Sequence, residues 1–232
     1  MEIELILDAK DKSVPLSFGV TRMVNAGYTG RNQEEVRRHI EELAAKGIPG
    51  PEKTPTLYPV ICRTLLQDEA VEVYGDETCG EVEYVLFVKD KNTIYVGLGS
   101  DHTDRHLEET DIPRAKQICP NLISRKVWPL SELEGHWDEL EITSKMMQGG
   151  EEILYQKGRL ELIMNPEGLM KFVLSKIPGP LDGTVIYSGT IGSLAGGFVF
   201  GEKFMAELFD PKLNRRLELA YDIRPLDYMT VE

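Results

Sequence analysis

The stretch Gly80–Asp101, GEVEYVLFVKDKNTIYVGLGSD, predicts two paired strands joined by a tight turn. Aromatic and β-branched residues fill both halves, and the polar KDKN between them is typical of a hairpin connection. Side chains two residues apart on a strand project from the same face, so Glu81 and Glu83 would hold their carboxylates side by side. The turn would bring Asp101 close to both. The stretch therefore predicts a sheet hairpin with three carboxylates at one end.

The rest of the sequence adds strands and a few helices. EIELIL followed by a more apolar run predicts an N-terminal hairpin, and FMAELFD and RRLELAYDI around PKLN predict a second hairpin near the C-terminus. A cap at Asn32, apolar residues at helical spacing and a stop at Gly47 predict a helix from about Gln33 to Lys46. Pro166 predicts the first turn of another helix. The pattern is typical of an α+β protein that is predominantly β, with a mixed, largely antiparallel β-roll or sandwich and a few short helices.

Length and composition limit the classes of function. We expect 232 residues without an evident linker to form a single domain, 1–232. The 26 basic and 39 acidic residues give a net charge of -13, which argues against nucleic acid and anionic membrane as partners. No apolar run approaches the about 20 residues of a membrane-spanning helix, and the N-terminus is acidic, so a cytoplasmic protein is expected. Cys62, Cys79 and Cys119 form no CxxC pair, and we interpret all three as small buried apolar residues.

The three carboxylates have two interpretations. Exposed strand faces often carry Glu, and taken alone the motif favours solvated charges. If the carboxylates are enclosed, however, their mutual repulsion calls for a hard divalent cation, for which oxygen ligands suit Mg²⁺, Mn²⁺ or Ca²⁺. Glu81, Glu83 and Asp101 are therefore the candidate metal ligands.

A second pair of candidates lies on the predicted helix. His39 and Glu42 are three residues apart and can hydrogen-bond, which would fix the imidazole tautomer and raise its basicity. A surface histidine beside one of many acidic neighbours is the alternative, and spacing alone favours it. If the pair faces a cleft, it has the chemistry of a general base.

Cations and a glycine-rich segment could bind an anion. Arg105 and Lys116 could hold an anionic substrate or stabilise an oxyanion, although most such residues are solvated. In YSGTIGSLAGG, backbone N–H groups near Gly189 and the hydroxyl of Thr190 could hold a carboxylate or phosphate. The glycine spacing fits neither a P-loop nor a dinucleotide fingerprint, which argues against nucleotide binding.

Taken together and in order, these segments resemble the fumarylacetoacetate hydrolase superfamily. GRN followed by His39 and Glu42, GEVEYVLFV, Asp101 with Arg105 four residues later, AKQICP, and GTVIYSGT match its motifs from about Gly30 to Arg224. AKQICP is similar to the superfamily's lysine-containing loop. The chain looks most like an uncharacterised bacterial and archaeal branch.

The resemblance implies an N-terminal hairpin region, 1–30, before a catalytic core, 31–225, and a homodimer. It also implies a cation, usually Mg²⁺, on the three carboxylates, and a small anionic 2-oxo acid substrate. In that scheme His39, oriented by Glu42, and Lys116 are catalytic, and the metal stabilises the enolate released when a carbon–carbon bond breaks. The substrate would be held by a set of polar residues: Arg105, Lys116, Gln117, Gly189 and Thr190.

Two departures concern the substrate. Asp104 adds a negative charge beside Arg105, and Ile191 replaces the proline that usually follows Gly-Thr. We therefore expect a metal-dependent hydrolase of acylpyruvate-like 2-oxo acids. The alternatives are a decarboxylase, hydratase or isomerase on the same site, or a binding protein that holds a small acid through a metal without turnover.

Overall fold

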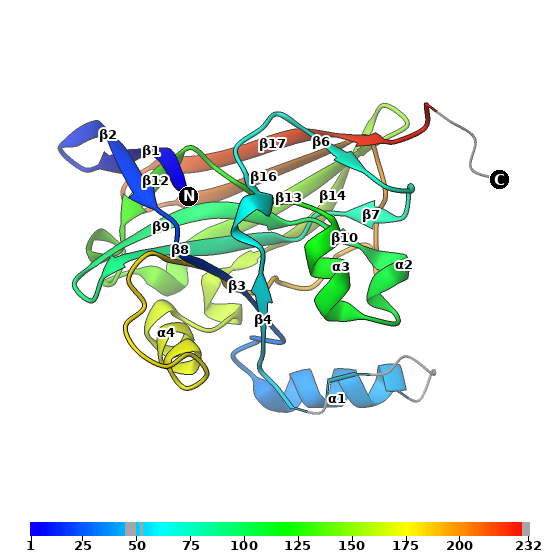
Figure 1. Ribbon diagram of the computed structural model, residues 1–232, viewed down its shortest axis with the longest axis horizontal. Coiled ribbons are helices and arrows are strands. Elements are labelled where there is room, and N and C mark those ends of the chain that lie inside the picture. Colours follow the sequence, from blue (N-terminus) through cyan, green and yellow to red (C-terminus); the bar gives the residue numbers. More distant parts are fainter. Residues whose placement is uncertain (45–49, 52, 229–232) are drawn as a thin grey trace.

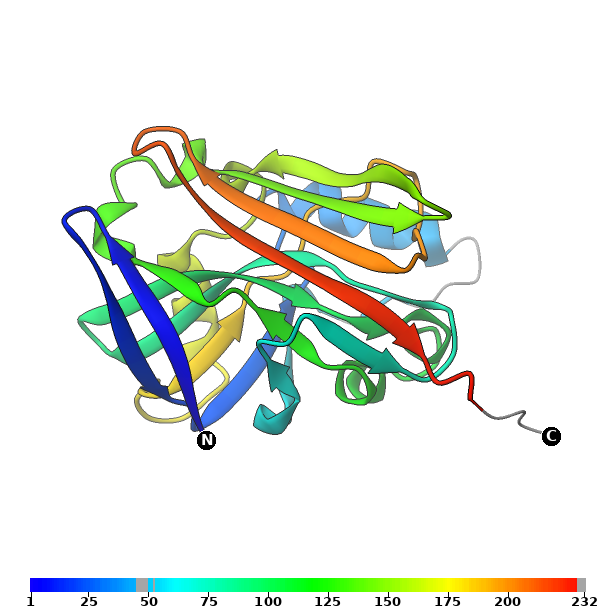
Figure 2. The ribbon, with the colours of Figure 1, turned by 90° about the horizontal axis from the view of Figure 1, so that it is seen from above.

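The computed structural model shows two stacked β-sheets with helices on the outer face of the larger one (Figure 1). It describes residues 1–44, 50–51 and 53–228. The five-stranded sheet lies above the ten-stranded sheet in Figure 1, and Figure 2 shows its strands crossing over those beneath. Helices α1 and α4 lie below the larger sheet.

The larger sheet has the strand order β2-β1-β12-β9-β8-β15-β3-β4, and β11 joins it by pairing with β5 and β9. Most neighbours are antiparallel, while β1 with β12, β15 with β3 and β11 with β5 are parallel. Its strands are β1 (Glu2–Ala9), β2 (Lys12–Gly19), β3 (Arg22–Gly27), β4 (Thr56–Val60), β5 (Leu65–Leu66), β8 (Val82–Asp90), β9 (Thr93–Asp101), β11 (Asn121–Ile123), β12 (Lys126–Pro129) and β15 (Thr184–Tyr187).

The smaller sheet has the order β14-β13-β16-β17-β6, and a separate two-stranded ladder pairs β10 with β7. These strands are β6 (Ala70–Val73), β7 (Thr78–Cys79), β10 (Thr103–Asp104), β13 (Glu141–Gln148), β14 (Glu151–Arg159), β16 (Lys203–Asp210) and β17 (Arg215–Pro225).

The helices are short. The α-helices are α1 (Gln33–Ala44), α2 (Arg105–Glu108), α3 (Ile112–Ile118) and α4 (Pro166–Leu174), and the 3-10 turns are η1 (Cys62–Thr64), η2 (Leu130–Glu132), η3 (Trp137–Glu139) and η4 (Leu160–Leu162). In the described part of the chain, no helix combines the length and apolarity that crossing a bilayer takes.

The position of strand β8 between two cores explains why its sequence is almost continuously apolar. Tyr84 and Leu86 belong to the core between the two sheets, whereas Val85 and Phe87 belong to a second core on the other face, under the β1–β2 hairpin. Because alternate side chains enter different cores, both faces of the strand are buried and a polar-apolar alternation is lost. By the same alternation, Glu83 lies on the face of Val85 and Phe87, away from the smaller sheet.

The predicted fold class is confirmed: the protein is mostly β, with mixed sheets and few helices. Both predicted hairpins are present as β1–β2 and β16–β17. The helix predicted from Gln33 is α1, which ends at Ala44; its predicted last residue, Lys46, and the stop at Gly47 lie outside the described residues. Pro166 opens α4, and the Asn165 side chain caps it.

Two expectations are wrong. Cys79 and Cys119 are buried, but Cys62 is only partly buried, because it lies in the short turn η1 at the edge of the sheet. The segment around Lys116 is not a loop but helix α3, because Asp111 caps it and Pro113 sits in its first turn.

Candidate metal centre

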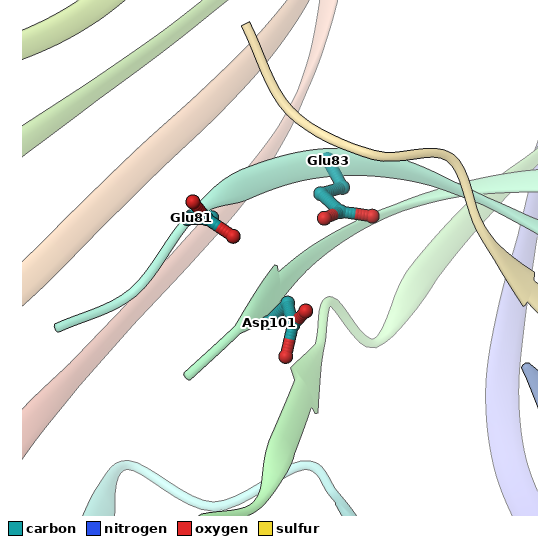
Figure 3. A group of neighbouring side chains, drawn as sticks. All are labelled: Glu81, Glu83 and Asp101. Atoms are coloured by element: carbon teal, nitrogen blue, oxygen red, sulfur yellow. The ribbon is translucent and has the colours of Figure 1, made fainter. Parts of the chain in front are cut away.

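The paired ends of β8 and β9 bring the three predicted carboxylates together. Glu81 directly precedes β8, and its backbone exchanges two hydrogen bonds with Asp101, each 3.1 Å long. Glu83 lies opposite Gly99 in the same ladder. One carboxylate oxygen from each of the three residues lies within 4.8 Å of the others. The side chains converge from the two strands on a common space, as Figure 3 shows.

Glu83 is the most enclosed of the three acids, with 1% of its surface exposed. Burial, and then the negative charges of Asp101 and Glu81, hold the pKa of its carboxyl well above the ordinary value. Its Oε2 accepts a 2.7 Å hydrogen bond from the backbone N–H of Gly189. Glu83 is thus a buried acid whose charged form needs a positive partner.

Gly189 can approach Glu83 because it has no side chain. Its φ is +80°, and a Cβ there would lie 2.4 Å from the Thr29 hydroxyl oxygen and 3.0 Å from the Ala26 carbonyl oxygen. Both the backbone conformation and the packing therefore require glycine at this turn.

Lys116 projects from α3 into the acidic cluster with 6% of its surface exposed. Its Nζ lies 2.8 Å from Asp101, 3.5 Å from Glu81 and 3.2 Å from Glu108, and it donates to the Thr103 hydroxyl at 3.1 Å. Burial lowers its pKa, but the three carboxylates outweigh that effect and hold the pKa well above the ordinary value. Lys116 therefore keeps its proton and its positive charge near neutral pH.

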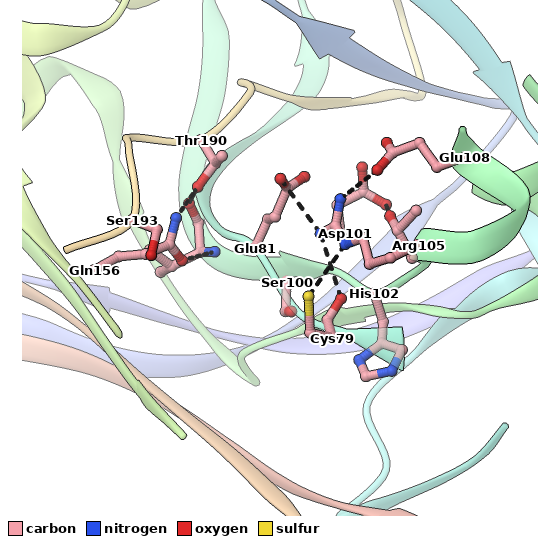
Figure 4. A network of polar contacts seen from close by, with 12 residues as sticks. Cys79, Glu81, Ser100, Asp101, His102, Arg105, Glu108, Gln156, Thr190 and Ser193 are labelled. Atoms are coloured by element: carbon pink, nitrogen blue, oxygen red, sulfur yellow. Dashed lines mark hydrogen bonds and ion pairs between the residues drawn. The ribbon is translucent and has the colours of Figure 1, made fainter. Parts of the chain in front are cut away.

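Arg105, the first residue of α2, is 4% exposed, and its guanidinium edges are occupied by protein groups. One end lies 2.6 Å from Glu108 and the other 3.3 Å from Glu81, while Nε donates to Cys79 Sγ at 3.1 Å. Figure 4 shows Arg105 with Cys79, Glu81 and Glu108, next to Asp101. In this arrangement Arg105 orients Glu81 and neutralises part of the acidic charge.

Sequence reasoning missed Glu108, which contacts both cations. Burial raises its pKa, but Lys116 and Arg105 lower it more, and the net direction is downward. The available signal was the helical spacing of Arg105 and Glu108, three residues apart. Asp104, expected as an added charge beside the site, instead accepts from Leu107 N through its carboxylate and caps α2.

A buried, neutral histidine, His102, follows β9 directly and holds the end of this strand in place. His102 is fully buried, with Nδ1 2.9 Å from the Tyr221 hydroxyl and Nε2 2.9 Å from the Thr78 hydroxyl. Burial, and then the charge of Arg105, lower the pKa of His102 to about 3. Through these two hydrogen bonds the uncharged His102 ring connects the chain next to Asp101 with β17 and β7, and it adds no charge to the site.

The other predicted substrate residues differ in placement. The Thr190 hydroxyl donates to the Val82 carbonyl at 2.7 Å and accepts from Gln156 at 2.7 Å, so it fixes the start of the glycine-rich loop near the triad. Gln117 donates to the Pro59 and Pro113 carbonyls and accepts from Ile61 N, which ties α3 to the end of β4. The structure places Thr190 beside the strand that carries Glu83 and uses Gln117 in backbone contacts.

His39 and Glu42, the predicted general base and its partner, both belong to helix α1. The side chains of His39 and Glu42 lie outside the described part of the structure. Their roles stay predictions.

The donor set fits a hard divalent cation. Three carboxylates supply only oxygen ligands, the kind preferred by Mg²⁺, Mn²⁺ and Ca²⁺. A divalent charge would also allow Glu83 to ionise in its buried position, which two like-charged neighbours otherwise oppose.

Comparisons with known proteins agree with this fold. A family model described as "Protein of unknown function (DUF2848)" matches residues 26–221, and the chain belongs to this family. No curated protein sequence matched the chain.

Solved structures share the architecture at low sequence identity. Cg1458 with inhibitor is 16% identical, with 97% of this chain and 89% of that chain covered and a TM-score of 0.63. 2-Keto-3-deoxy-D-arabinonate dehydratase complexed with magnesium and 2,5-dioxopentanoate is 15% identical, with 89% and 74% covered and a TM-score of 0.61. 4-Oxalocrotonate decarboxylase from Pseudomonas putida G7, complexed with calcium and acetate, is 15% identical, with 88% and 76% covered and a TM-score of 0.52. This chain shares its fold with these proteins, as its resemblance to the fumarylacetoacetate hydrolase superfamily predicts.

Proposed function

We propose that the protein is a divalent-metal-dependent enzyme that cleaves a carbon–carbon bond in an acylpyruvate-like 2-oxo acid. The observation that carries this proposal is the convergence of three carboxylates around a buried acid, Glu83, with a charged lysine at their side. Such a site offers ligands for a cation and a positive group for an anionic substrate. The magnesium and calcium complexes of the structural neighbours support the choice of cation.

The roles follow from the contacts. A bound Mg²⁺, or Mn²⁺ or Ca²⁺, would supply positive charge where negative charge develops on the oxygens of the 2-oxo acid. Lys116 would hold Asp101 in place. Because it stays protonated, its positive charge would also attract the substrate carboxylate. Arg105 would fix Glu81. Gly189, Thr190 and Gln117 would bind the anionic end of the substrate, for which each would exchange one of its present hydrogen bonds.

The reaction needs a base, for which His39 is the candidate. His39, oriented by Glu42, would take a proton from water as its oxygen attacks the distal carbonyl carbon. The carbon–carbon bond then breaks, its electron pair passes to the 2-oxo acid fragment as an enolate, and that fragment takes up a proton. The products are a carboxylic acid and a shorter 2-oxo acid, and atoms and charge balance with one water consumed.

A second candidate keeps the site and changes the reaction. One structural neighbour is a dehydratase and another a decarboxylase, both of which accord with enolate chemistry on a 2-oxo acid. Product analysis separates the candidates: hydrolysis gives two acids, dehydration gives water and one unsaturated or rearranged 2-oxo acid, and decarboxylation gives carbon dioxide.

The test is a screen of the protein, with Mg²⁺ or Mn²⁺, against acylpyruvates, oxaloacetate and unsaturated 2-oxo acids. We expect turnover of an acylpyruvate, and we expect His39→Ala to lower kcat by about 10²–10⁴-fold while ligand binding is retained. Unchanged turnover in His39→Ala would remove the base assignment. Binding of these acids without turnover of any would favour the binding-protein alternative.

The assembly is part of the proposal. We expect a homodimer in which residues 31–225 carry the catalytic core. Light scattering on the purified protein measures its mass directly, and a monomer at all concentrations would contradict the dimer.

A further inference from the structure

The loop between β15 and β16, residues 188–202, touches the surroundings of the triad at two points. Near its start, Gly189 donates its N–H to Glu83 at 2.7 Å. Near its end, the ring of Phe198 lies over the guanidinium of Arg105, with the Arg105 Cζ 4.4 Å from the ring centroid. Arg105 in turn reaches Glu81. The same loop therefore contacts Glu83 directly and Glu81 indirectly, through Arg105.

Phe198 is held in place although it is exposed. Ile191 and Val199 are buried and anchor the two ends of the loop, 5% and 9% exposed. Between them, the Ser193 hydroxyl donates to the Gly197 carbonyl and accepts from Ala195 N. Phe198 itself is 52% exposed. An anchored loop thus presents an aromatic ring with one face on a cation and much of its surface open.

The open aromatic surface contrasts with the occupied edges of Arg105. The guanidinium already serves Glu81, Glu108 and Cys79, so meeting a substrate would cost it those contacts. The exposed part of the Phe198 ring can contact a substrate without the loss of an existing contact. A ligand that chelates a cation on the triad and extends past Arg105 would meet this ring first.

We propose that Phe198 is a specificity-determining residue that packs against the non-chelating end of the 2-oxo acid and selects an apolar or aromatic group there. The inference rests on the proposed function, because it needs a substrate chelated at the triad. An aromatic ring backed by a cation favours stacking of apolar groups. A carboxylate at this end would find the guanidinium edges of Arg105 already occupied by Glu81 and Glu108.

The test compares two unreactive probes on protein loaded with Mg²⁺ or Mn²⁺, measured by titration calorimetry. Oxalate chelates and has no further group, whereas benzoylformate is a 2-oxo acid with an aromatic end and no enolisable carbon. We expect Phe198→Ala to weaken benzoylformate by about tenfold and to change oxalate by less than about twofold. Phe198→Tyr, which keeps the ring, should restore benzoylformate binding.

Leu194 provides the matched control. It lies on the same loop, is 58% exposed, and its backbone N–H donates to the Tyr155 carbonyl. Leu194→Ala should leave both probes unchanged. The inference is overturned if Phe198→Ala weakens both probes equally, which would indicate only a role in holding Arg105, or if Leu194→Ala has the same effect as Phe198→Ala. If oxalate does not bind the metal-loaded wild type, the proposed function itself fails.

Discussion

Two buried charge clusters among the described residues differ in their balance of acids and cations. At the triad, the acids Glu81, Glu83, Asp101 and Glu108 meet the two cations Lys116 and Arg105. At the other cluster, near the β16–β17 turn, Asp210 and Glu132 meet Arg215 and His136.

In the second cluster each buried oxygen of Asp210 has a donor. Oδ1 accepts from His136 Nε2 at 2.9 Å and from the backbone N–H groups of Lys212 and Leu213, and Oδ2 accepts from Arg215 Nε at 3.3 Å. Arg215 also reaches Glu132 at 2.7 Å and stacks over the Trp128 ring. These contacts hold the turn and η2 against the strands.

The difference lies in what remains unsatisfied. In the second cluster both carboxylate oxygens of Asp210 have donors, whereas the triad leaves Glu83 a buried acid whose pKa is raised by burial and by its neighbours. Burial of charge alone therefore does not mark a functional site. Convergence of like charges that the fold leaves uncompensated does.

Replacing Glu83 by Gln gives the largest expected effect. The amide keeps the shape of the side chain but removes a ligand, so we expect Mg²⁺ or Mn²⁺ affinity to fall by more than about 100-fold, beyond what loss of an outer contact costs. The metal-free protein should be no less stable, because a buried acid has been replaced by a neutral group. Calorimetric metal titration and thermal unfolding measure the two quantities. Unchanged metal stoichiometry would refute the metal site.

The same acid-to-amide change in the second cluster should have the opposite pattern. Asp210→Asn removes the fully buried one of the two countercharges of Arg215 and leaves it Glu132, and we expect the free energy of unfolding to fall by about 3 kcal/mol. Metal affinity should stay at the wild-type value, because Asp210 does not belong to the triad. Denaturant unfolding with a parallel metal titration checks both. A loss of metal binding at this position would mean that the two clusters are coupled.

The dependence of stability on pH should separate the clusters more finely. Because the folded pKa of Glu83 lies above its unfolded value of 4.5, the folded state binds more protons above that pH. The contribution of Glu83 is therefore full below pH 4.5 and is lost as pH rises toward its folded pKa, by up to about 1.4 kcal/mol per pH unit. Glu83→Gln should remove this slope in metal-free protein, and Asp210→Asn should retain it. Since the cation needs the ionised acid, metal binding to wild type should release protons and strengthen as pH rises.

Sequence reasoning found the fold where local pattern and tertiary structure agree. The hairpins β1–β2, β8–β9 and β16–β17 follow from apolar strands and polar turns, and α4 follows from Asn165 and Pro166. Helices α2 and α3 were not predicted because they are only one or two turns long, too short for a periodic apolar pattern to be recognised. Their caps, Asp104 and Asp111, were the local signals.

The candidate site was predictable in part for the same reason. Glu81, Glu83 and Asp101 are brought together by one hairpin, so their convergence follows from strand geometry. The contact of Phe198 with Arg105 joins segments about ninety residues apart and has no counterpart in local spacing. The occupied edges of Arg105 likewise depend on tertiary packing, which spacing within Asp-x-x-x-Arg does not reveal.

Replacing Lys116 by Met should give the smallest effect and tests how the triad's charge is shared. Lys116 lies 2.8 Å from Asp101, so it partly neutralises the same oxygens that a cation would use. Without it the carboxylates attract a divalent ion more strongly, and we expect metal affinity to rise by about tenfold, which is 1.4 kcal/mol, while binding of oxalate to the loaded protein weakens. Lys145→Met is the matched control, because Lys145 forms an exposed ion pair with Glu152 and should affect neither quantity. If metal affinity instead falls in Lys116→Met, the lysine serves chiefly to hold Asp101 in its ligating position, and the two clusters would then share one principle, a cation that fixes a buried acid.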